Sequence, residues 1–232
     1  MLHRPQQHRN RVDAPAAPLL MLPGTLCDAR LYAPVLERVG VRAAVPELTG
    51  ADSATEMARS ILGGAPPRFS LCGFSLGAIV ALEITAQAPQ RVERLALIGC
   101  NPGRLDDKSR ATRAALTQSD FATEDDCPLV HLMARDTTPE TYRQQTRMTL
   151  DRADSRPRLS RIDVPTLVMC GAQDRTCPPA MSIGIAGAIP HARLVIVPGA
   201  GHYLPLERPQ VVADELAAWL AMPVHNTAKE PS

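Results

Sequence analysis

The chain has 232 residues, a length that suits one domain of the larger sort with a sizeable hydrophobic core. Hydrophobic residues make up 45% of it, and 25 basic against 24 acidic side chains give a formal net charge of +1. This balance argues against nucleic acid or an anionic membrane surface as a partner.

The N-terminal segment and the cysteines indicate the cellular compartment of the protein. Residues 1–18 are polar and basic, contain several prolines and lack the apolar stretch of a secretory signal. No apolar run reaches membrane-spanning length. The six cysteines form no C-x-x-C pair and no Cys/His cluster at metal-ligand spacing. We therefore expect a cytoplasmic protein with a disordered tail at residues 1–16, reduced thiols and no bound metal.

Short apolar runs alternate with helical patterns along the chain, which is typical of parallel strands joined by crossover helices. Each run closes with Gly or Pro, as expected for strands covered on both faces. The predicted fold class is therefore α/β, with a mostly parallel central sheet and helices on both faces. The expected strands are residues 19–22, 41–45, 69–74, 94–99, 166–171 and 193–197.

The stretches between these runs carry helix start and stop signals. Asp28 and Ser53 are good N-caps, and Pro89 ends the helix that would follow Ser75. The last helical stretch has the apolar spacing of an amphipathic helix. The expected helices are residues 29–39, 54–62, 76–87, 179–189 and 210–220.

One segment, residues 104–161, breaks the alternation of strands and helices. It is polar, charged and helix-prone, without a convincing strand, and it lies between two strand runs. We expect it to form a short helical lid inserted over the edge of the sheet. The predicted domain thus spans residues 17–222, and residues 223–232 are expected to be a C-terminal tail.

The strongest local signal is the G-x-S-x-G pattern at residues 73–77, which carries Ser75. A strand is expected directly before it and a helix directly after it, which is the context that a nucleophilic serine on a sharp turn requires. The glycines are needed because a Cβ on either side of so tight a turn would clash. Ser75 is therefore the candidate nucleophile.

A serine hydroxyl is a weak nucleophile and needs a base. His202 follows an expected strand and the turn at residues 198–201, which places it at the same carboxyl edge of the sheet as Ser75. A loop histidine alone is usually a surface residue. Asp174 also follows an expected strand at this edge and could orient the imidazole, although an Asp at such a turn often caps a helix. The order Ser, Asp, His makes the combination specific.

An acyl-transfer serine also needs donors for the developing oxyanion. The backbone N–H of Leu76, directly after the nucleophile, is the first candidate. The loop after the first strand begins with Pro23 and Gly24, and the N–H of Thr25 is the second candidate. We expect these two groups to form an oxyanion hole.

Four longer motifs resemble those of the α/β-hydrolase fold superfamily, within it the small esterase, lactonase and haloperoxidase-like branch. They read LPGTLCDARLYAPVL, RFSLCGFSLGAIVALEITAQAPQRVERLALIG, VPTLVMCGAQDRTCPP and PGAGHYLPLERPQVVADELAAWL. The resemblance covers residues 17–220 and is weak only across the insertion. It implies the same nucleophile, acid, base and oxyanion donors that the residues themselves indicate. Many relatives have His-Gly where this chain has Pro23-Gly24, and its insertion is short, which predicts an open, shallow pocket.

Other residues are expected either to line the pocket or to lie away from it. Glu83 lies eight positions beyond Ser75 and is expected to face solvent or a helix neighbour, not to serve as the triad acid. The residues expected to contact the acyl group are Leu26, Cys27, Met133 and Cys177.

These features predict a serine hydrolase that cleaves a small carboxylic ester through an acyl-enzyme intermediate. The expected partner is a small acyl substrate, with no cofactor, no nucleic acid and no membrane. A thioesterase or lactonase would use the same three residues, and a non-catalytic ligand-binding protein could keep the same scaffold. The sequence leaves the oligomeric state open.

Overall fold

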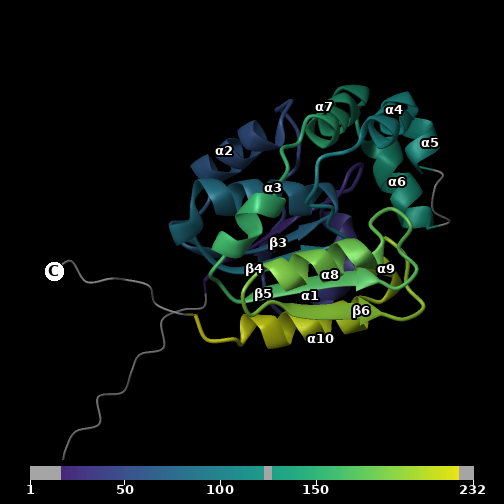
Figure 1. The fold of residues 1–232 in the computed structure, drawn as a ribbon. Coiled ribbons are helices and arrows are strands. Elements are labelled where there is room, and N and C mark those ends of the chain that lie inside the picture. Colours follow the sequence, from purple (N-terminus) through teal and green to yellow (C-terminus); the bar gives the residue numbers. More distant parts are fainter. Residues whose placement is uncertain (1–16, 123–126, 225–232) are drawn as a thin grey trace, which may run out of the picture.

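The computed structural model describes residues 17–122 and 127–224, so the tail expected at 1–16 and residues 225–232 lie outside the described residues. Its centre is a six-stranded sheet in the order β2-β1-β3-β4-β5-β6, and every neighbouring pair is parallel (Figure 1). The predicted α/β class with a parallel sheet is confirmed. The strands are β1 (Leu19–Leu22), β2 (Ala43–Ala44), β3 (Phe69–Phe74), β4 (Val92–Ile98), β5 (Thr166–Gly171) and β6 (Arg193–Val197).

The bounds of β1, β3, β5 and β6 are those predicted, whereas β2 and β4 differ. β2 lies at the edge of the sheet and pairs only through Ala43 and Ala44, so the rest of its apolar run stays outside the ladder. Val41, in that remainder, is exposed. β4 begins earlier than predicted because Val92 already pairs with Phe69 before the register shifts.

The helices that cover the sheet follow the predicted positions with one exception. The helix expected at 29–39 is divided in two because Pro34 has no N–H to continue the hydrogen-bond ladder. Ser53 caps α2 as predicted, its side chain accepting from the N–H of Glu56. These helices are η1 (Ala29–Leu31), α1 (Ala33–Val39), α2 (Ala54–Gly64), α3 (Leu76–Gln87), η2 (Pro89–Arg91), α8 (Pro179–Ala188), α9 (Leu204–Glu207) and α10 (Pro209–Leu220).

Alternate residues of the strands supply two cores, one on each face of the sheet. Leu20 and Leu22 of β1 pack with residues of α2, α3 and α8. Leu19 and Met21, the intervening residues, pack with residues of α1 and α10. Figure 1 shows α2 and α3 above the sheet and α10 below it. The sheet is therefore covered on both sides, as near-continuous apolar strands require.

Glu83 of α3 faces a helix neighbour, which is one of the two positions predicted for it. Its side chain is only 7% exposed and forms an ion pair with Arg158 of η3 (Arg156–Arg161). α3 is buried along most of its length because α2 and η3 both pack over it. The carboxylate is thus enclosed and neutralised within the helix layer.

The described part of residues 104–161 contains helices and no strand. These helices are α4 (Asp107–Ala115), α5 (Gln118–Ala122), α6 (Pro128–Asp136), α7 (Pro139–Leu150) and η3. Figure 1 shows α4 to α7 grouped at the top right. Val130 and Met133 of α6 enter the core beside α1, whereas Met148 of α7 enters the core beside α3. The segment therefore packs against both helix layers.

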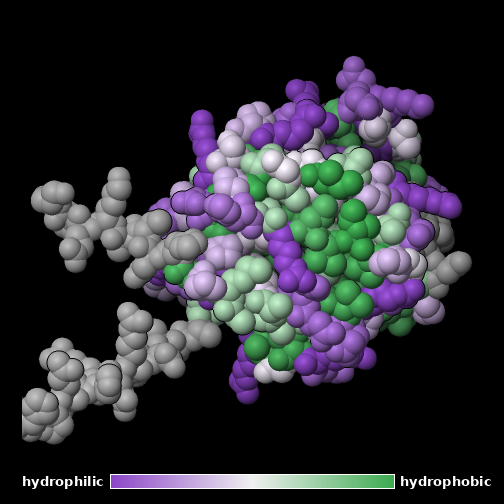
Figure 2. All heavy atoms as spheres, turned by 60° about the horizontal axis from the view of Figure 1, so that its bottom comes forward, coloured by the Kyte–Doolittle hydropathy of each residue, from purple (hydrophilic) through white to green (hydrophobic). Residues whose placement is uncertain are grey.

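The surface is mixed in polarity. Figure 2 shows hydrophobic side chains gathered on one face of the molecule. Ile183 of α8 and Ile196 of the edge strand β6 are among the exposed large hydrophobic residues. Within residues 17–122 and 127–224, every helix is too short or too polar to cross a membrane.

Candidate active site

Ser75 lies on the turn between β3 and α3 with a strained backbone. Its φ of 53° and ψ of −113° fall in a region that residues other than glycine rarely adopt. A Cβ on Gly73 would lie 2.4 Å from the carbonyl oxygen of Gly77, and one on Gly77 would lie 2.1 Å from that of Leu22. The two glycines of the motif are therefore required by close backbone approach, as the sequence predicted.

His202 is brought to Ser75 by the loop after β6. Its Nε2 lies 3.1 Å from the Oγ of Ser75, and its side chain is 11% exposed. The ring packs against Phe74 with a centroid separation of 5.0 Å. This packing against Phe74 holds the imidazole within hydrogen-bonding distance of the serine hydroxyl.

Asp174 completes a hydrogen-bonded chain of three side chains. Its Oδ2 lies 2.8 Å from Nδ1 of His202, and its side chain is 1% exposed. The other carboxylate oxygen accepts from the N–H groups of Thr176 at 2.9 Å and Cys177 at 2.7 Å. The carboxylate is therefore oriented from one side by the backbone and presents its free oxygen to the imidazole.

Two residues that the sequence analysis did not single out support His202. Glu207 of α9 accepts the N–H of Gly201 through Oε2 at 2.6 Å, which secures the loop just before the histidine. Gly99, directly after β4, has a φ of 56°, and a Cβ there would lie 3.2 Å from Cε1 of His202. The only sequence signal for these residues is their position near a strand end or near His202.

The loop after β1 approaches Ser75 closely. A Cβ on Gly24 would lie 2.8 Å from the ring of Phe74 and 3.4 Å from the Cβ of Ser75. A turn follows, closed by the N–H of Cys27 donating to the carbonyl of Gly24 at 3.2 Å. Thr25 occupies this turn and is 6% exposed.

Leu76 is the first residue of α3, so its N–H has no carbonyl acceptor within its own helix. The helix dipole adds positive potential at this end. The two expected oxyanion donors, Leu76 and Thr25, thus belong to the two backbone segments that adjoin Ser75.

All four residues predicted to contact the acyl group have buried side chains. Leu26 and Cys27 lie in the loop after β1, Cys177 follows Asp174, and Met133 is on α6. Their contact with the acyl group stays a prediction. Burial raises the pKa of the Cys27 thiol, and the nearby charge of Asp28 adds to this. Burial and then the charge of Asp174 likewise raise the pKa of Cys177. Both thiols are therefore neutral and are poor nucleophiles.

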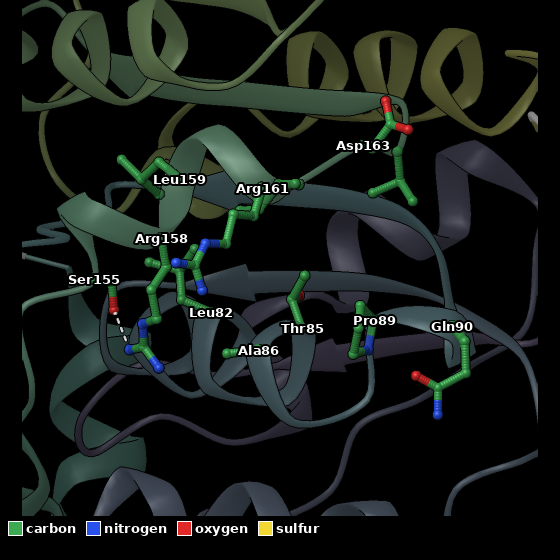
Figure 3. Close-up of a pocket in the computed structure, with 12 residues that line it drawn as sticks. Leu82, Thr85, Ala86, Pro89, Gln90, Ser155, Arg158, Leu159, Arg161 and Asp163 are labelled. Carbon is green, nitrogen blue, oxygen red and sulfur yellow. Dashed lines mark hydrogen bonds between the residues drawn. The ribbon is translucent and has the colours of Figure 1, made fainter. Parts of the chain in front are cut away.

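A separate pocket of about 450 Å³ lies at the other end of α3. Figure 3 shows it between Leu82, Thr85 and Ala86 of α3 and Arg158 of η3, whose Nη2 donates to the Oγ of Ser155 at 3.0 Å. Leu82 is seven positions beyond Ser75, so the pocket begins about 10 Å away along the helix axis. Its lining residues include no histidine, and the one carboxylate among them is that of Asp163.

Within the described residues, His, Cys, Asp and Glu side chains form no group of three or more that could hold a metal ion. The chemistry that the site can perform is instead that of the hydrogen-bonded serine, histidine and aspartate. In such a chain the imidazole can take a proton from the hydroxyl while the carboxylate stabilises the resulting cation.

The sequence matches a model of the alpha/beta hydrolase family over residues 13–215. The chain therefore belongs to the alpha/beta hydrolase family, and the predictions of this fold and of a hydrolase enzyme are confirmed.

Two individual proteins are similar to this chain at low sequence identity. The chain is similar to a pimeloyl-[acyl-carrier protein] methyl ester esterase from Nitrosomonas europaea, with 28% identity over 65% of this chain and 71% of that protein. It is also similar to a putative carbamate hydrolase, RutD, from Cronobacter sakazakii, with 28% identity over 75% of this chain and 73% of the relative.

Solved structures share the fold. The enol-lactonase from Burkholderia xenovorans LB400 superposes with a TM-score of 0.76 at 22% identity, over 94% of each chain. A hydrolase from Pseudomonas aeruginosa PA01 gives a TM-score of 0.76 at 24% identity, over 90% of this chain and 92% of that one.

Proposed function

We propose that this protein is a serine hydrolase that cleaves a small carboxylic ester through an acyl-enzyme intermediate. The observation that carries the proposal is the hydrogen-bonded chain from Ser75 through His202 to Asp174, with separations of 3.1 and 2.8 Å. Ser75 acts as nucleophile, His202 as general base and then general acid, and Asp174 orients the imidazole and stabilises its cation.

Acylation begins when Oγ of Ser75 attacks the ester carbonyl carbon while its proton passes to Nε2 of His202. The carbonyl electron pair moves to oxygen and forms a tetrahedral oxyanion. When this intermediate collapses, the bond to the alkoxy group breaks and His202 gives its proton to the departing alcohol.

Deacylation repeats these steps with water, in place of the serine hydroxyl, as the attacking group. His202 takes a proton from the water as it attacks the acyl carbon, and the second tetrahedral intermediate expels Oγ of Ser75. The proton returns to Ser75, and a carboxylic acid leaves. Neither half-reaction requires a metal or an organic cofactor.

The N–H groups of Thr25 and Leu76 hold the oxyanion in both half-reactions. Leu76 is favourable because its N–H opens a helix and is not used within it. Thr25 follows Gly24, whose missing side chain allows the loop to lie against Ser75. Removing one such donor from a serine hydrolase typically costs about 10²- to 10³-fold in kcat.

The proposed substrate is a small molecule with an ester of modest size, met in the cytoplasm. Esterases are prominent among the relatives, and the Nitrosomonas relative is named for a methyl ester. Residues 104–161 are proposed to form a lid of which α6 supplies Met133 to the acyl site. Thioesters and lactones present the same carbonyl chemistry to the three residues, so they are tested alongside esters.

The proposal is tested by measuring turnover of p-nitrophenyl esters, acyl thioesters and lactones by the wild type and by Ser75→Ala. Ester turnover is expected to be fastest and to be lost in Ser75→Ala. Ser70→Ala is a matched control, because this buried serine on β3 has no hydrogen-bond partner for its hydroxyl among the described residues. Tight ligand binding that survives Ser75→Ala, without turnover of any substrate, would instead favour a non-catalytic binding protein.

A further inference from the structure

Gln145 of α7 connects three separate segments of the chain. Its Oε1 accepts the N–H of Leu26 at 2.8 Å, and its Nε2 donates to the carbonyl of Leu48 at 3.1 Å. The side chain is almost completely enclosed, at 2% exposure. Leu26 is 119 positions away in sequence and directly follows Thr25. A buried amide from the insertion thus reaches the backbone of the proposed oxyanion loop.

The backbone that Gln145 holds is strained. Leu26 has a φ of 58°, in the left-handed region that disfavours a residue with a bulky side chain. It is the third residue of the turn from Gly24 to Cys27, the position at which a type II turn normally has glycine. A leucine stays there only when its surroundings hold it. The hydrogen bond to Gln145 provides such a restraint on the peptide that joins Thr25 to Leu26.

We propose that Gln145 is a positioning residue for the oxyanion hole. By fixing the Leu26 N–H it keeps the turn in the conformation that directs the Thr25 N–H toward the reacting carbonyl. Gln145 itself does not touch the substrate in this scheme. The inference rests on the proposed function, because it assigns Gln145 to the same acyl-transfer site.

The neighbouring residue on α7 offers a matched comparison. Gln144 accepts the N–H of Gly50 at 2.8 Å through Oε1, so it also ties α7 to the loop that precedes α2. Within the described residues its hydrogen bonds go to Thr49 and Gly50, and not to the loop after β1. A variant of Gln144 therefore loosens the attachment of α7 and leaves the Leu26 hydrogen bond in place.

The test compares Gln145→Met with Gln144→Met, each in the full-length enzyme. Methionine keeps an unbranched side chain of similar length and removes the amide. We expect Gln145→Met to lower kcat by about 10- to 100-fold with little change in KM, because a displaced donor weakens transition-state binding. Gln144→Met is expected to keep kcat close to the wild type. Circular dichroism and the melting temperature establish that both variants are folded.

A second substitution separates positioning of the turn from general packing. Glycine adopts positive φ without strain, so Leu26→Gly removes the need for the restraint. In the Leu26→Gly background, Gln145→Met should therefore lower kcat by a smaller factor than in the wild type. If Gln145→Met does not fold, Gln145→Glu decides, since it keeps an acceptor for Leu26 and is expected to lose less than 10-fold in kcat.

Several results would overturn the inference. These are an unchanged kcat in Gln145→Met, a loss no larger than that of Gln144→Met, an equal loss in the Leu26→Gly background, or, where only Gln145→Glu folds, a loss above about 10-fold. The failure of the proposed function looks different. In that case the wild type turns over no ester, or Ser75→Ala turns it over equally well, and the role of Gln145 falls with it.

Discussion

The Oγ of Ser75 lies 3.1 Å from Nε2 of His202, although 127 positions separate the two residues. Their strands, β3 and β6, are not neighbours, because β4 and β5 lie between them. The histidine ring lies beside Gly99, at the end of β4. At a spacing of about 4.8 Å between strands, the loop after β6 thus carries the imidazole back across roughly 10 Å of sheet edge toward Ser75.

Replacing Gly99 with alanine should disturb this arrangement. The added Cβ would lie 3.2 Å from the His202 ring, and the φ of 56° would be strained for alanine. We expect kcat to fall by about 10-fold or more. Stability should decrease by about 1 kcal/mol, measured by urea unfolding. Gly187→Ala on α8 is the control, since nothing lies within 4 Å of its added Cβ and alanine favours helix.

Asp174→Asn should leave the site folded and nearly inactive. The amide oxygen can still accept from the N–H groups of Thr176 and Cys177, whereas its NH₂ would face Nδ1 of His202 and favour the wrong tautomer. Steady-state kinetics should show a loss of about 10³- to 10⁴-fold in kcat.

Asp214→Asn on α10 provides the matched control for this prediction. Asp214 accepts from Gln210 on the exposed side of the helix, a role that an amide oxygen can fill. The kcat of the Asp214→Asn variant should equal that of the wild type. A modest effect of Asp174→Asn, similar to that of Asp214→Asn, would show that the carboxylate does not assist His202.

The buried thiols should resist alkylation at about pH 8. Burial raises the pKa of Cys72 and Cys100 to about 12, and raises those of Cys27 and Cys177 as well. A raised pKa lowers the thiolate fraction at a given pH, so reactivity should appear only as the pH approaches the raised value.

Iodoacetamide treatment followed by mass spectrometry measures this directly. Cys127, which is not fully buried, should be modified first, and ester hydrolysis should be retained. In denaturant all six cysteines should react. Loss of activity that follows modification of Cys27 or Cys177 in the folded protein would contradict the burial of these thiols.

The sequence predicted the strands and the three aligned side chains well because both depend on local pattern. A parallel strand covered on both faces is a continuous apolar run, and β3 and β5 have the bounds that such runs indicate. Ser75 lies in a motif that itself requires the turn. Asp174 and His202 follow strands whose carboxyl ends must meet at one edge.

The features that the sequence did not reveal depend on contacts between distant segments of the chain. Glu83 was expected to face either solvent or a helix neighbour, and the sequence could not decide between the two because its partner Arg158 lies 75 positions away. Gln145 gave no signal, since a glutamine in a polar helix of the insertion resembles any solvated residue. Only the folding of α7 onto the loops after β1 and β2 brings its amide to Leu26.

The central claim is that Ser75 is an activated nucleophile, and a fluorophosphonate probe tests it most directly. The intact enzyme should be labelled with one probe per chain, on the peptide that contains Ser75, as located by mass spectrometry. Labelling should be absent in Ser75→Ala and unchanged in Ser70→Ala. Ester hydrolysis that proceeds without labelling of Ser75, or labelling that persists in Ser75→Ala, would contradict the account.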